Sequence, residues 1–355
     1  REANMNKKER SFLNGELWTI VSMIVVLAGG ALIVAATVND ASAQSAPVTD
    51  NFELGDGVNP TVPGTADVLG SSVQTGPDWN DLFDANRQPL DVYDENGVLA
   101  SNGVPDFLDT FGSLKNRRDA AFLLDDISAG GGTDQTVFVA PGTLGAGTVD
   151  AASDLGNVYA YSRFNDTMDF VLYTGLERLA PGVGRIDLEF NQSEFSIGAT
   201  GAIQGVRTEG DLLIGADYTG AALTAITLSM WTLVDPETSD YQWVAVESLP
   251  INPEDPAEQC NAGGTICALC NSANVDGGAW QNYGDDGAVI QELGPDSFME
   301  LGINLSAELG VHTYQNYYQA RYVSVQVTTF DTAATPTAQD YSVGSFIRAS
   351  RFAGN

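Results

Sequence analysis

The sequence has very little positive charge. It contains 15 lysines and arginines but 47 aspartates and glutamates, so the formal net charge is −32 at pH 7. The first 43 residues hold equal numbers of basic and acidic side chains, and beyond them only one lysine remains, Lys115. A polyanion of this kind repels phosphate backbones and anionic lipid headgroups. Nucleic acid is therefore excluded as a partner, and so is a membrane, apart from contact through the N-terminal segment.

Histidine is almost absent as well. A Ser-His-Asp or Cys-His catalytic site would have to use His312, the one histidine of the chain. No G-x-S-x-G motif precedes a helix-like segment, no P-loop is present, and no His/Cys cluster has the spacing of a zinc site. The sequence therefore predicts a domain that is not an enzyme and that has no cofactor other than the calcium considered below.

The one long apolar run lies near the N-terminus, at residues 17–38. The basic residues Lys7, Lys8 and Arg10 lie on its N-terminal side, and the small-x-small triplet Ala-Ser-Ala follows at 41–43. This order is typical of a secretory signal peptide, predicted here over residues 1–43, with a mature chain beginning at Gln44. An uncleaved membrane anchor is the alternative, because about 20 apolar residues span a bilayer. Both interpretations predict that the rest of the chain is extracellular or on the cell surface.

The remaining chain has enough apolar residues to fold, since 43% of the sequence is hydrophobic. Its apolar residues alternate with polar ones in short runs separated by Gly, Pro, Asn and Asp, a pattern typical of antiparallel strands. Strands are expected at 158–161, 170–176, 186–190, 212–218, 223–234, 243–245, 298–305, 322–330 and 343–348. The sequence thus predicts an all-β fold, an antiparallel β-sandwich or jelly roll with long irregular loops.

One large domain is predicted after the leader. Residues 44–78 are rich in Gly, Pro, Ser and Thr and are expected to form an irregular arm. A single β-sandwich domain is expected over 79–355, with a cysteine-bearing loop insert at 252–297. The insert has too few apolar residues for a core of its own. Single turns of helix are expected at 81–86 and 306–309.

The insert carries the only cysteines of the chain, Cys260, Cys267 and Cys270. An odd number in an exported protein allows at most one intrachain disulfide and leaves one thiol. Because the three lie in a loop-like segment, a disulfide between two of them is favoured over a metal site.

Calcium is the cation that the acidic loops would suit, because it takes several oxygen ligands from carboxylates and loop carbonyls. None of the loops has EF-hand spacing, and solvated turns would show the same composition. The candidate ligands are Asp91, Asp94, Asp125, Asp126, Asp285 and Asp286.

Asp187 and Glu189 form a candidate carboxylate pair. They alternate with apolar residues, so both should project from one face of a strand. A retaining glycosidase needs two carboxyl groups about 5–5.5 Å apart, which neighbours of this kind can approach. Arg178 and Arg185 are close enough in sequence to neutralise the pair, so an ion-paired outer sheet face is favoured over a catalytic site.

Glu300 is a carboxylate of a different kind, because apolar residues flank it. Alternation places it on the same face as Phe298, where a buried carboxylate would need a partner such as Arg321 or an ion.

Seven segments, in this order along the chain, resemble a family of large secreted bacterial surface proteins of unknown function. They are NFELGDG (51–57), PDWNDLF (77–83), DISAGGGTD (126–134), NVYAY (157–161), LYTGLER (172–178), DLEFNQ (187–192) and FMELGINL (298–305). The resemblance covers most of residues 51–348. Members of the family often carry prealbumin-like or other adhesin-type repeats, and this sequence contains none. The resemblance implies an extracellular β domain and supplies no catalytic residues.

These observations predict a non-catalytic extracellular surface or matrix domain that acts in adhesion or binds a glycan, a cation or a surface protein. A glycan-active hydrolase on a jelly-roll scaffold is one alternative. A structural subunit of an extracellular assembly is another, and it would need an exposed strand edge or a donor strand.

Overall fold

The computed structural model describes residues 79–83, 85, 119–124, 134–147, 149–164, 169–182, 184–254, 259–284, 286, 288–309, 322–331, 336–345 and 347–348. The chain separates into two units, Arg1–Gln44 and Ser45–Asn355, and all of these residues belong to the second unit. The apolar run at 17–38 and the arm at 44–78 lie outside the described residues. Within the described ranges, no helix is long and apolar enough to cross a membrane.

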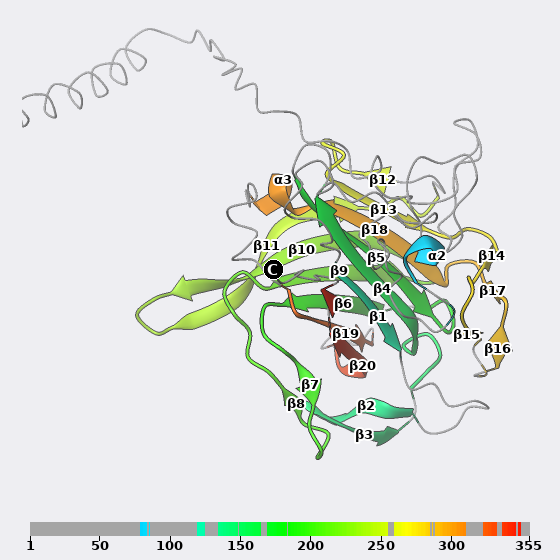
Figure 1. Cartoon of the computed structure of the whole chain (residues 1–355), viewed down its shortest axis with the longest axis horizontal. Helices are drawn as coiled ribbons and strands as arrows, with labels where there is room; N and C mark the ends of the chain where they lie inside the picture. The colour runs from blue at the N-terminus through cyan, green and yellow to red at the C-terminus, as the bar shows by residue number, and fades with distance from the viewer. Residues whose placement is uncertain are drawn as a thin grey trace, which may run out of the picture. The chain divides into compact units, whose positions relative to one another are not determined.

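Two antiparallel sheets pack face to face, which confirms the predicted all-β sandwich (Figure 1). The first sheet has the order β12 (Gln259–Cys260), β13 (Ile266–Cys270), β18 (Phe298–Asn304), β5 (Phe170–Arg178), β4 (Leu155–Phe164), β1 (Asp119–Leu124) and β21 (Ile347–Arg348). The second sheet has the order β11 (Asp240–Pro250), β10 (Ala222–Asp235), β9 (Leu212–Thr219), β6 (Gly184–Asn191), β19 (Ser324–Phe330) and β20 (Ala338–Ser345).

Smaller elements lie outside these sheets. The two-stranded pairs are β2 (Asp134–Ala140) with β3 (Thr143–Gly147), β7 (Ser196–Ile197) with β8 (Ile203–Gln204), β14 (Val275–Asp276) with β17 (Glu292–Leu293), and β15 (Asn282–Tyr283) with β16 (Val289–Ile290). The helices are α2 (Trp79–Leu82) and α3 (Leu305–Leu309). Asn304 caps α3 by accepting a hydrogen bond of 3.0 Å from the Ala307 amide on its Oδ1 atom.

The chain crosses between the two sheets four times. It passes from the first sheet to the second between β5 and β6 and between β18 and β19, and it returns after β11 and after β20. β18 pairs with β5, and β19 pairs with β6, so the crossing strands are neighbours in both sheets. The central strands are therefore fixed by contacts between parts of the chain that are far apart in sequence.

The first hydrophobic core lies between the sheets. The first sheet contributes alternate residues such as Leu172 and Leu301, and the second contributes residues such as Leu188 and Ile214. All four are fully buried, and full burial of a leucine or isoleucine stabilises a fold by about 1.5–3 kcal/mol. The apolar residues that recur at every second position of the sequence are those that point into this core.

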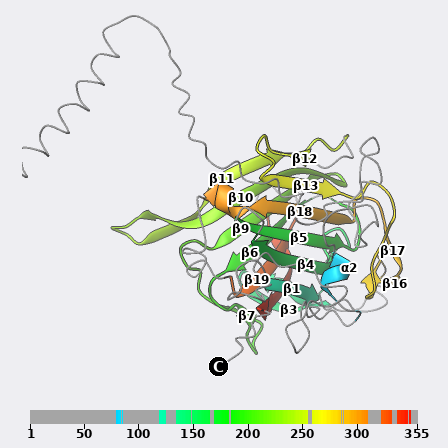
Figure 2. The same ribbon diagram turned by 45° about the horizontal axis from the view of Figure 1, so that its top comes forward.

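A second hydrophobic core lies on the opposite face of the first sheet. Every residue of β5 is buried, because Val171 and Tyr173 face this second core while Leu172 and Leu176 face the first. α2 covers the second core from the outside (Figure 2). The residues of the second core are Trp79, Leu82, Phe83, Tyr159, Tyr161, Val171, Tyr173, Cys267, Leu269, Val275, Trp280, Leu293 and Phe298.

Gly175 makes room for the indole of Trp79 in the second core. A Cβ atom at this position would lie 2.8 Å from Cδ2 of Tyr159 and 3.0 Å from Nε1 of Trp79. Both are closer than side chains normally approach a Cβ atom, so glycine allows the two aromatic rings to pack over the strand. Their centroids are 5.3 Å apart, and the rings are stacked.

The segment at 252–297, which we expected to be a loop insert, is part of the sandwich. It contains β13, which pairs with β18 along its full length and extends the first sheet. Its residues after β13 include Val275, Trp280 and Leu293, which cover the second core. The segment therefore has no separate core, because it shares one with the first sheet.

Candidate ligand-binding face

The predicted carboxylate pair lies on the outer face of the second sheet, on β6. Asp187 accepts a hydrogen bond of 2.6 Å from Nε of Arg185, whose Nη1 lies 3.2 Å from Oδ1 of Asp217. Burial raises the pKa of Asp187, the Arg185 guanidinium opposes that rise, and the charges of Asp217 and Glu189 add to it. Asp187 is thus ion-paired and still harder to ionise than a free aspartate.

Glu189 is held by a bidentate ion pair with Arg207. The guanidinium Nε and Nη2 atoms each lie 2.8 Å from a different carboxylate oxygen. Oε1 of Glu189 also accepts hydrogen bonds from Asn191 Nδ2 at 2.6 Å and from Gln326 Nε2 at 3.2 Å. The hydroxyl of Tyr341 donates to Oε1 of Gln326 at 2.6 Å. Four donors therefore fix the carboxylate of Glu189 in place.

Of the two arginines expected to neutralise the pair, only Arg185 does so. Arg178 lies elsewhere, with its guanidinium 3.8 Å from the ring centroid of Tyr218. It donates hydrogen bonds to the backbone carbonyls of Gly182, Ala221 and Asp296. The expectation for Arg178 was wrong, because its side chain reaches carbonyls of nearby connecting segments. Arg207 takes its place from the segment between β8 and β9, which sequence proximity did not indicate.

Three aromatic side chains extend this face along the β10–β11 hairpin. Trp231 and Trp243 are opposite each other in the ladder, with ring centroids 5.1 Å apart. Trp231 also stacks on Tyr241, at 6.2 Å and an interplanar angle of 12°. We call Tyr241, Trp231 and Trp243 the aromatic strip. All three are partly exposed, so their rings are available to a ligand.

Arg207 joins the aromatic strip to the ion pair. Its guanidinium carbon lies 5.4 Å from the ring centroid of Trp231 and 5.5 Å from that of Trp243, within the range of a cation–π interaction. The register connects Glu189 through Leu213 to Ser229, two residues before Trp231 on the same face of β10. The aromatic strip, Arg207 and Glu189 thus form one continuous surface.

We did not predict the aromatic strip, although the sequence contains a pattern that indicates it. Residues 231–243 surround the turn signal Asp235-Pro236, and a hairpin there pairs Trp231 with Trp243. Alternation then places Tyr241 on the same face as both tryptophans.

The calcium ligands that we predicted lie outside the described residues, with one exception. Asp286 is exposed, and its Oδ1 accepts a hydrogen bond of 2.9 Å from the Ala288 amide. Among the described residues, no group of three or more His, Cys, Asp or Glu side chains is arranged to hold a metal ion. Calcium binding remains a prediction about all six residues, Asp91, Asp94, Asp125, Asp126, Asp285 and Asp286, because Asp285, the neighbour of Asp286, lies outside the described residues.

Glu300 is fully buried on the same side of β18 as Phe298, as alternation predicts. Its Oε1 accepts a hydrogen bond of 2.6 Å from the indole Nε1 of Trp79. Arg321, the expected partner, lies outside the described residues, as does His312. The partner found is a tryptophan because α2 packs over β18 in the second core.

Glu177 is a second buried carboxylate on this side of the first sheet, and we did not predict it. It accepts hydrogen bonds from the hydroxyl of Tyr159 and from the backbone amide and Nδ2 of Asn157, the last at 2.8 Å. Burial, followed by the charge of Glu177, raises the pKa of Tyr159. Both carboxylates hold polar aromatic groups of the second core in place.

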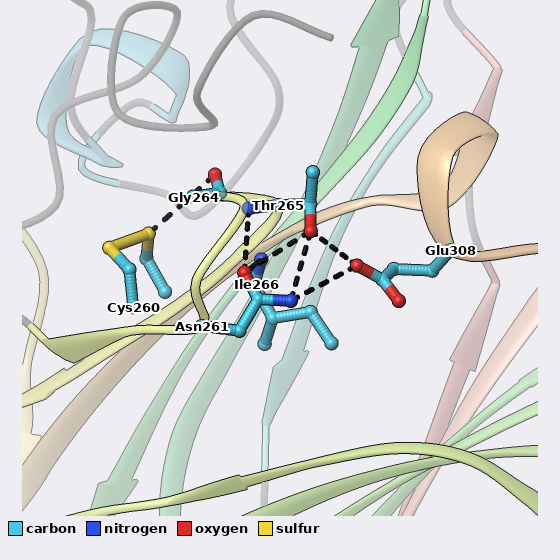
Figure 3. Close-up of a disulfide and its surroundings, with 7 residues drawn as sticks. Cys260, Asn261, Gly264, Thr265, Ile266 and Glu308 are labelled. Atoms are coloured by element: carbon cyan, nitrogen blue, oxygen red, sulfur yellow. Dashed lines mark hydrogen bonds between the residues drawn. A yellow bond between two sulfur atoms is a disulfide. The ribbon is translucent and has the colours of Figure 1, made fainter. Parts of the chain in front are cut away.

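The predicted disulfide joins Cys260 and Cys267, which are opposite each other in the β12–β13 pair (Figure 3). The turn between them is fixed by Asn261, whose Oδ1 accepts hydrogen bonds from the amides of Thr265 and Ile266. The hydroxyl of Thr265 donates to Glu308 of α3. Cys270 is the free thiol, and burial raises its pKa to about 12.

Comparison of the chain with protein-family models, with curated proteins and with solved structures found no match. Functional inference therefore rests on the geometry of this face.

Proposed function

We propose that this chain is a non-catalytic extracellular domain that binds a glycan on the outer face of its second sheet. One observation carries the proposal: the partly exposed ring of Trp231 contacts those of Tyr241 and Trp243, which are also partly exposed, beside an arginine held by a buried carboxylate. The extracellular location rests on the apolar run at 17–38, and the resemblance to secreted surface proteins agrees with it.

The chemistry of the aromatic strip suits a sugar. A pyranose ring has an apolar face of C–H groups and a rim of hydroxyls, so it can pack on an aromatic ring while its hydroxyls form hydrogen bonds. The Nη1 group of Arg207 forms no hydrogen bond among the described residues and can donate to such hydroxyls. The net charge of −32 favours a neutral glycan over an anionic one.

The ion pairs support a binding role over a hydrolytic one. A retaining mechanism needs one carboxylate free to attack the anomeric carbon. Glu189 instead accepts four hydrogen bonds, two of them from Arg207. To act as a nucleophile, Glu189 would have to break its ion pair with Arg207.

The proposal can be tested by calorimetry against soluble neutral oligosaccharides that a glycan array has selected. Trp243→Ala should weaken binding at least tenfold, which corresponds to about 1.4 kcal/mol. Val244→Ala is the matched control, because Val244 is the next residue of β11 and lies on the other face of the hairpin. Equal affinity in wild type, Trp243→Ala and Trp231→Ala would exclude the aromatic strip as the binding site.

One observation favours a glycan hydrolase as the second candidate. Burial raises the pKa of Asp187, which is the direction of shift that a general acid needs. Incubation with a panel of polysaccharides should release no reducing sugar from any of them. Release that disappears in both Asp187→Asn and Glu189→Gln would replace the binding proposal with the hydrolase.

A further inference from the structure

β11 is an edge strand of the second sheet. Among the described residues it pairs with β10 alone, so its other side has no partner strand within this part of the chain. Residues 241–246 of this strand are Tyr-Gln-Trp-Val-Ala-Val, without a charge, a lysine or a proline. Natural edge strands usually carry charged residues, lysine or proline, because an open, uncharged edge can pair with a strand of another chain. β11 lacks these protections along this stretch.

The backbone direction shows which groups face the open side. The amide of Trp231 donates to the carbonyl of Asp211 at 2.9 Å, and its carbonyl accepts from the amide of Gly210 at 2.9 Å. Both groups of Trp231 thus point away from β11. In an antiparallel pair, the residue opposite then points its own N–H and C=O away as well. The backbone groups of Trp243 therefore face the open edge.

The same holds two residues away on either side, at Tyr241 and Ala245, because backbone directions alternate along a strand. The regular stretch ends at Val246, where a β-bulge shifts the register between Leu228 and Ser229. A straight, uncharged segment of edge at 241–245 is thus centred on Trp243.

We propose that this segment pairs with the same segment of a second copy of the chain. A twofold antiparallel arrangement about Trp243 places each Trp243 opposite its counterpart, and Tyr241 of one copy opposite Ala245 of the other. This register lets every outward backbone N–H and C=O of 241, 243 and 245 form a hydrogen bond. It brings no two charged residues opposite each other, since Asp240 faces position 246 of the other copy.

The end of the β10–β11 hairpin extends beyond the rest of the second sheet, so two copies can contact each other there while their charged bodies stay apart. Thr232, Leu233 and Asp235 of β10 have ladder partners in β11 only, and the hairpin projects beyond the other strands in both ribbon views (Figures 1 and 2). Repulsion between the two anionic bodies still opposes pairing. Salt reduces it, because the Debye length falls from about 8 Å at 0.15 M to about 3 Å at 1 M. Association should therefore strengthen with sodium chloride.

Pairing would bring the two aromatic strips together around the twofold axis. This inference is independent of glycan binding, because it depends on backbone groups of β11 and not on what the aromatic rings contact. A chain that dimerises and binds no sugar would keep this proposal and lose the previous one.

Sedimentation equilibrium of the purified chain, at sodium chloride concentrations from 0.05 to 1 M, gives the first test. We expect a monomer–dimer equilibrium that shifts to dimer as salt rises. Val244→Asp should weaken the dimer roughly tenfold, because it places a charge opposite Gln242 of the other copy and the two new charges lie diagonally across the junction on the same face. Val234→Asp is the matched control. It adds the same charge at similar exposure, 44% against 41%, on β10 of the same hairpin. A monomer at every salt concentration would overturn the proposal.

Cysteine crosslinking tests the register. In a hydrogen-bonded antiparallel pair the two Cα atoms are about 5.5 Å apart, within the range of a disulfide. A mixture of Tyr241→Cys and Ala245→Cys chains should therefore form crosslinked dimers under mild oxidation, while either variant alone should form few. Equal crosslinking in the mixture and in the separate variants would exclude this pairing.

Discussion

Trp79 donates a hydrogen bond of 2.6 Å from its indole Nε1 to Oε1 of Glu300, across 221 positions of the sequence. Both side chains are fully buried. A carboxylate away from water is costly unless donors satisfy it, so the indole does more than fill space. This contact ties a short segment near the start of the described chain to a central strand of the first sheet.

We therefore predict that Trp79→Ala lowers the free energy of unfolding by about 3–5 kcal/mol, the usual cost of removing a buried tryptophan. Trp79→Phe keeps an aromatic ring but removes the indole donor from Glu300, and it should cost about 1–3 kcal/mol. Urea unfolding measures both values. Trp243→Phe, at a partly exposed position, serves as control and should change stability by less than about 0.5 kcal/mol. A neutral Trp79→Phe would show that the hydrogen bond is dispensable.

The strands of the sandwich could be predicted because every second residue points into the first core and is apolar, while its neighbours are polar. Leu188 and Phe190 of β6, for example, are fully buried and lie between polar or charged neighbours. Their spacing in the sequence shows the sheet face directly. The predicted helical turns at 81–86 and 306–309 also overlap α2 and α3.

The second core could not be predicted in the same way. Strands that are covered on both faces lose the alternation, as β5 does with its run Phe-Val-Leu-Tyr-Thr-Gly-Leu. The run at 266–270, Ile-Cys-Ala-Leu-Cys, is apolar enough to be a buried strand. We predicted a loop there because the flanking residues are rich in glycine, asparagine and aspartate. Which segment covers the outer face depends on contacts between distant residues, which no local pattern reports.

The ion pair between Arg207 and Glu189 predicts an asymmetric response to mutation. The Glu189 side chain is 8% exposed and that of Arg207 41%. Arg207→Ala leaves a buried carboxylate with amide donors only, and should cost about 1–3 kcal/mol. Glu189→Gln leaves a guanidinium that water can reach, and should cost less. Urea unfolding of both variants checks the order, which the reverse result would contradict.

Asp187 predicts a specific pH dependence. Burial raises its pKa above the usual 3.8, so the folded state binds a proton more tightly than the unfolded state. Stability from this group is therefore full below the unfolded pKa and is lost as the pH rises through the folded pKa. Unfolding free energies of wild type minus Asp187→Asn should fall as the pH rises from about 3.5 upward. A difference that rises with pH would mean that Arg185 outweighs burial.

Cys270 predicts a difference between native and denatured protein in thiol titration. Burial raises the pKa of this half-buried thiol to about 12, so at pH 8 it is protonated and reacts slowly. We expect almost no reaction in the native chain and one equivalent after denaturation without reductant. Three equivalents would contradict the disulfide between Cys260 and Cys267. Rapid reaction of the native chain would contradict the raised pKa of Cys270.

The net charge of −32 predicts that salt stabilises the fold. Carboxylates crowd one another on the folded surface, and each close pair at about 4 Å costs on the order of 1 kcal/mol in water. Unfolding spreads these charges apart, so screening favours the folded state, and the melting temperature should rise with sodium chloride.

A calcium site among the acidic loops would add a separate effect, because a ligand that binds only the folded state stabilises it by RT ln(1 + [L]/Kd). Titration of calcium in a constant background of 1 M sodium chloride separates the two, since general screening is already complete there. A further rise in melting temperature at millimolar calcium, which magnesium does not reproduce, would support a site involving Asp91, Asp94, Asp125, Asp126, Asp285 or Asp286. No further rise would leave screening alone. A melting temperature that responds to neither salt nor calcium would mean that the acidic surface is not strained, and the electrostatic prediction would be wrong.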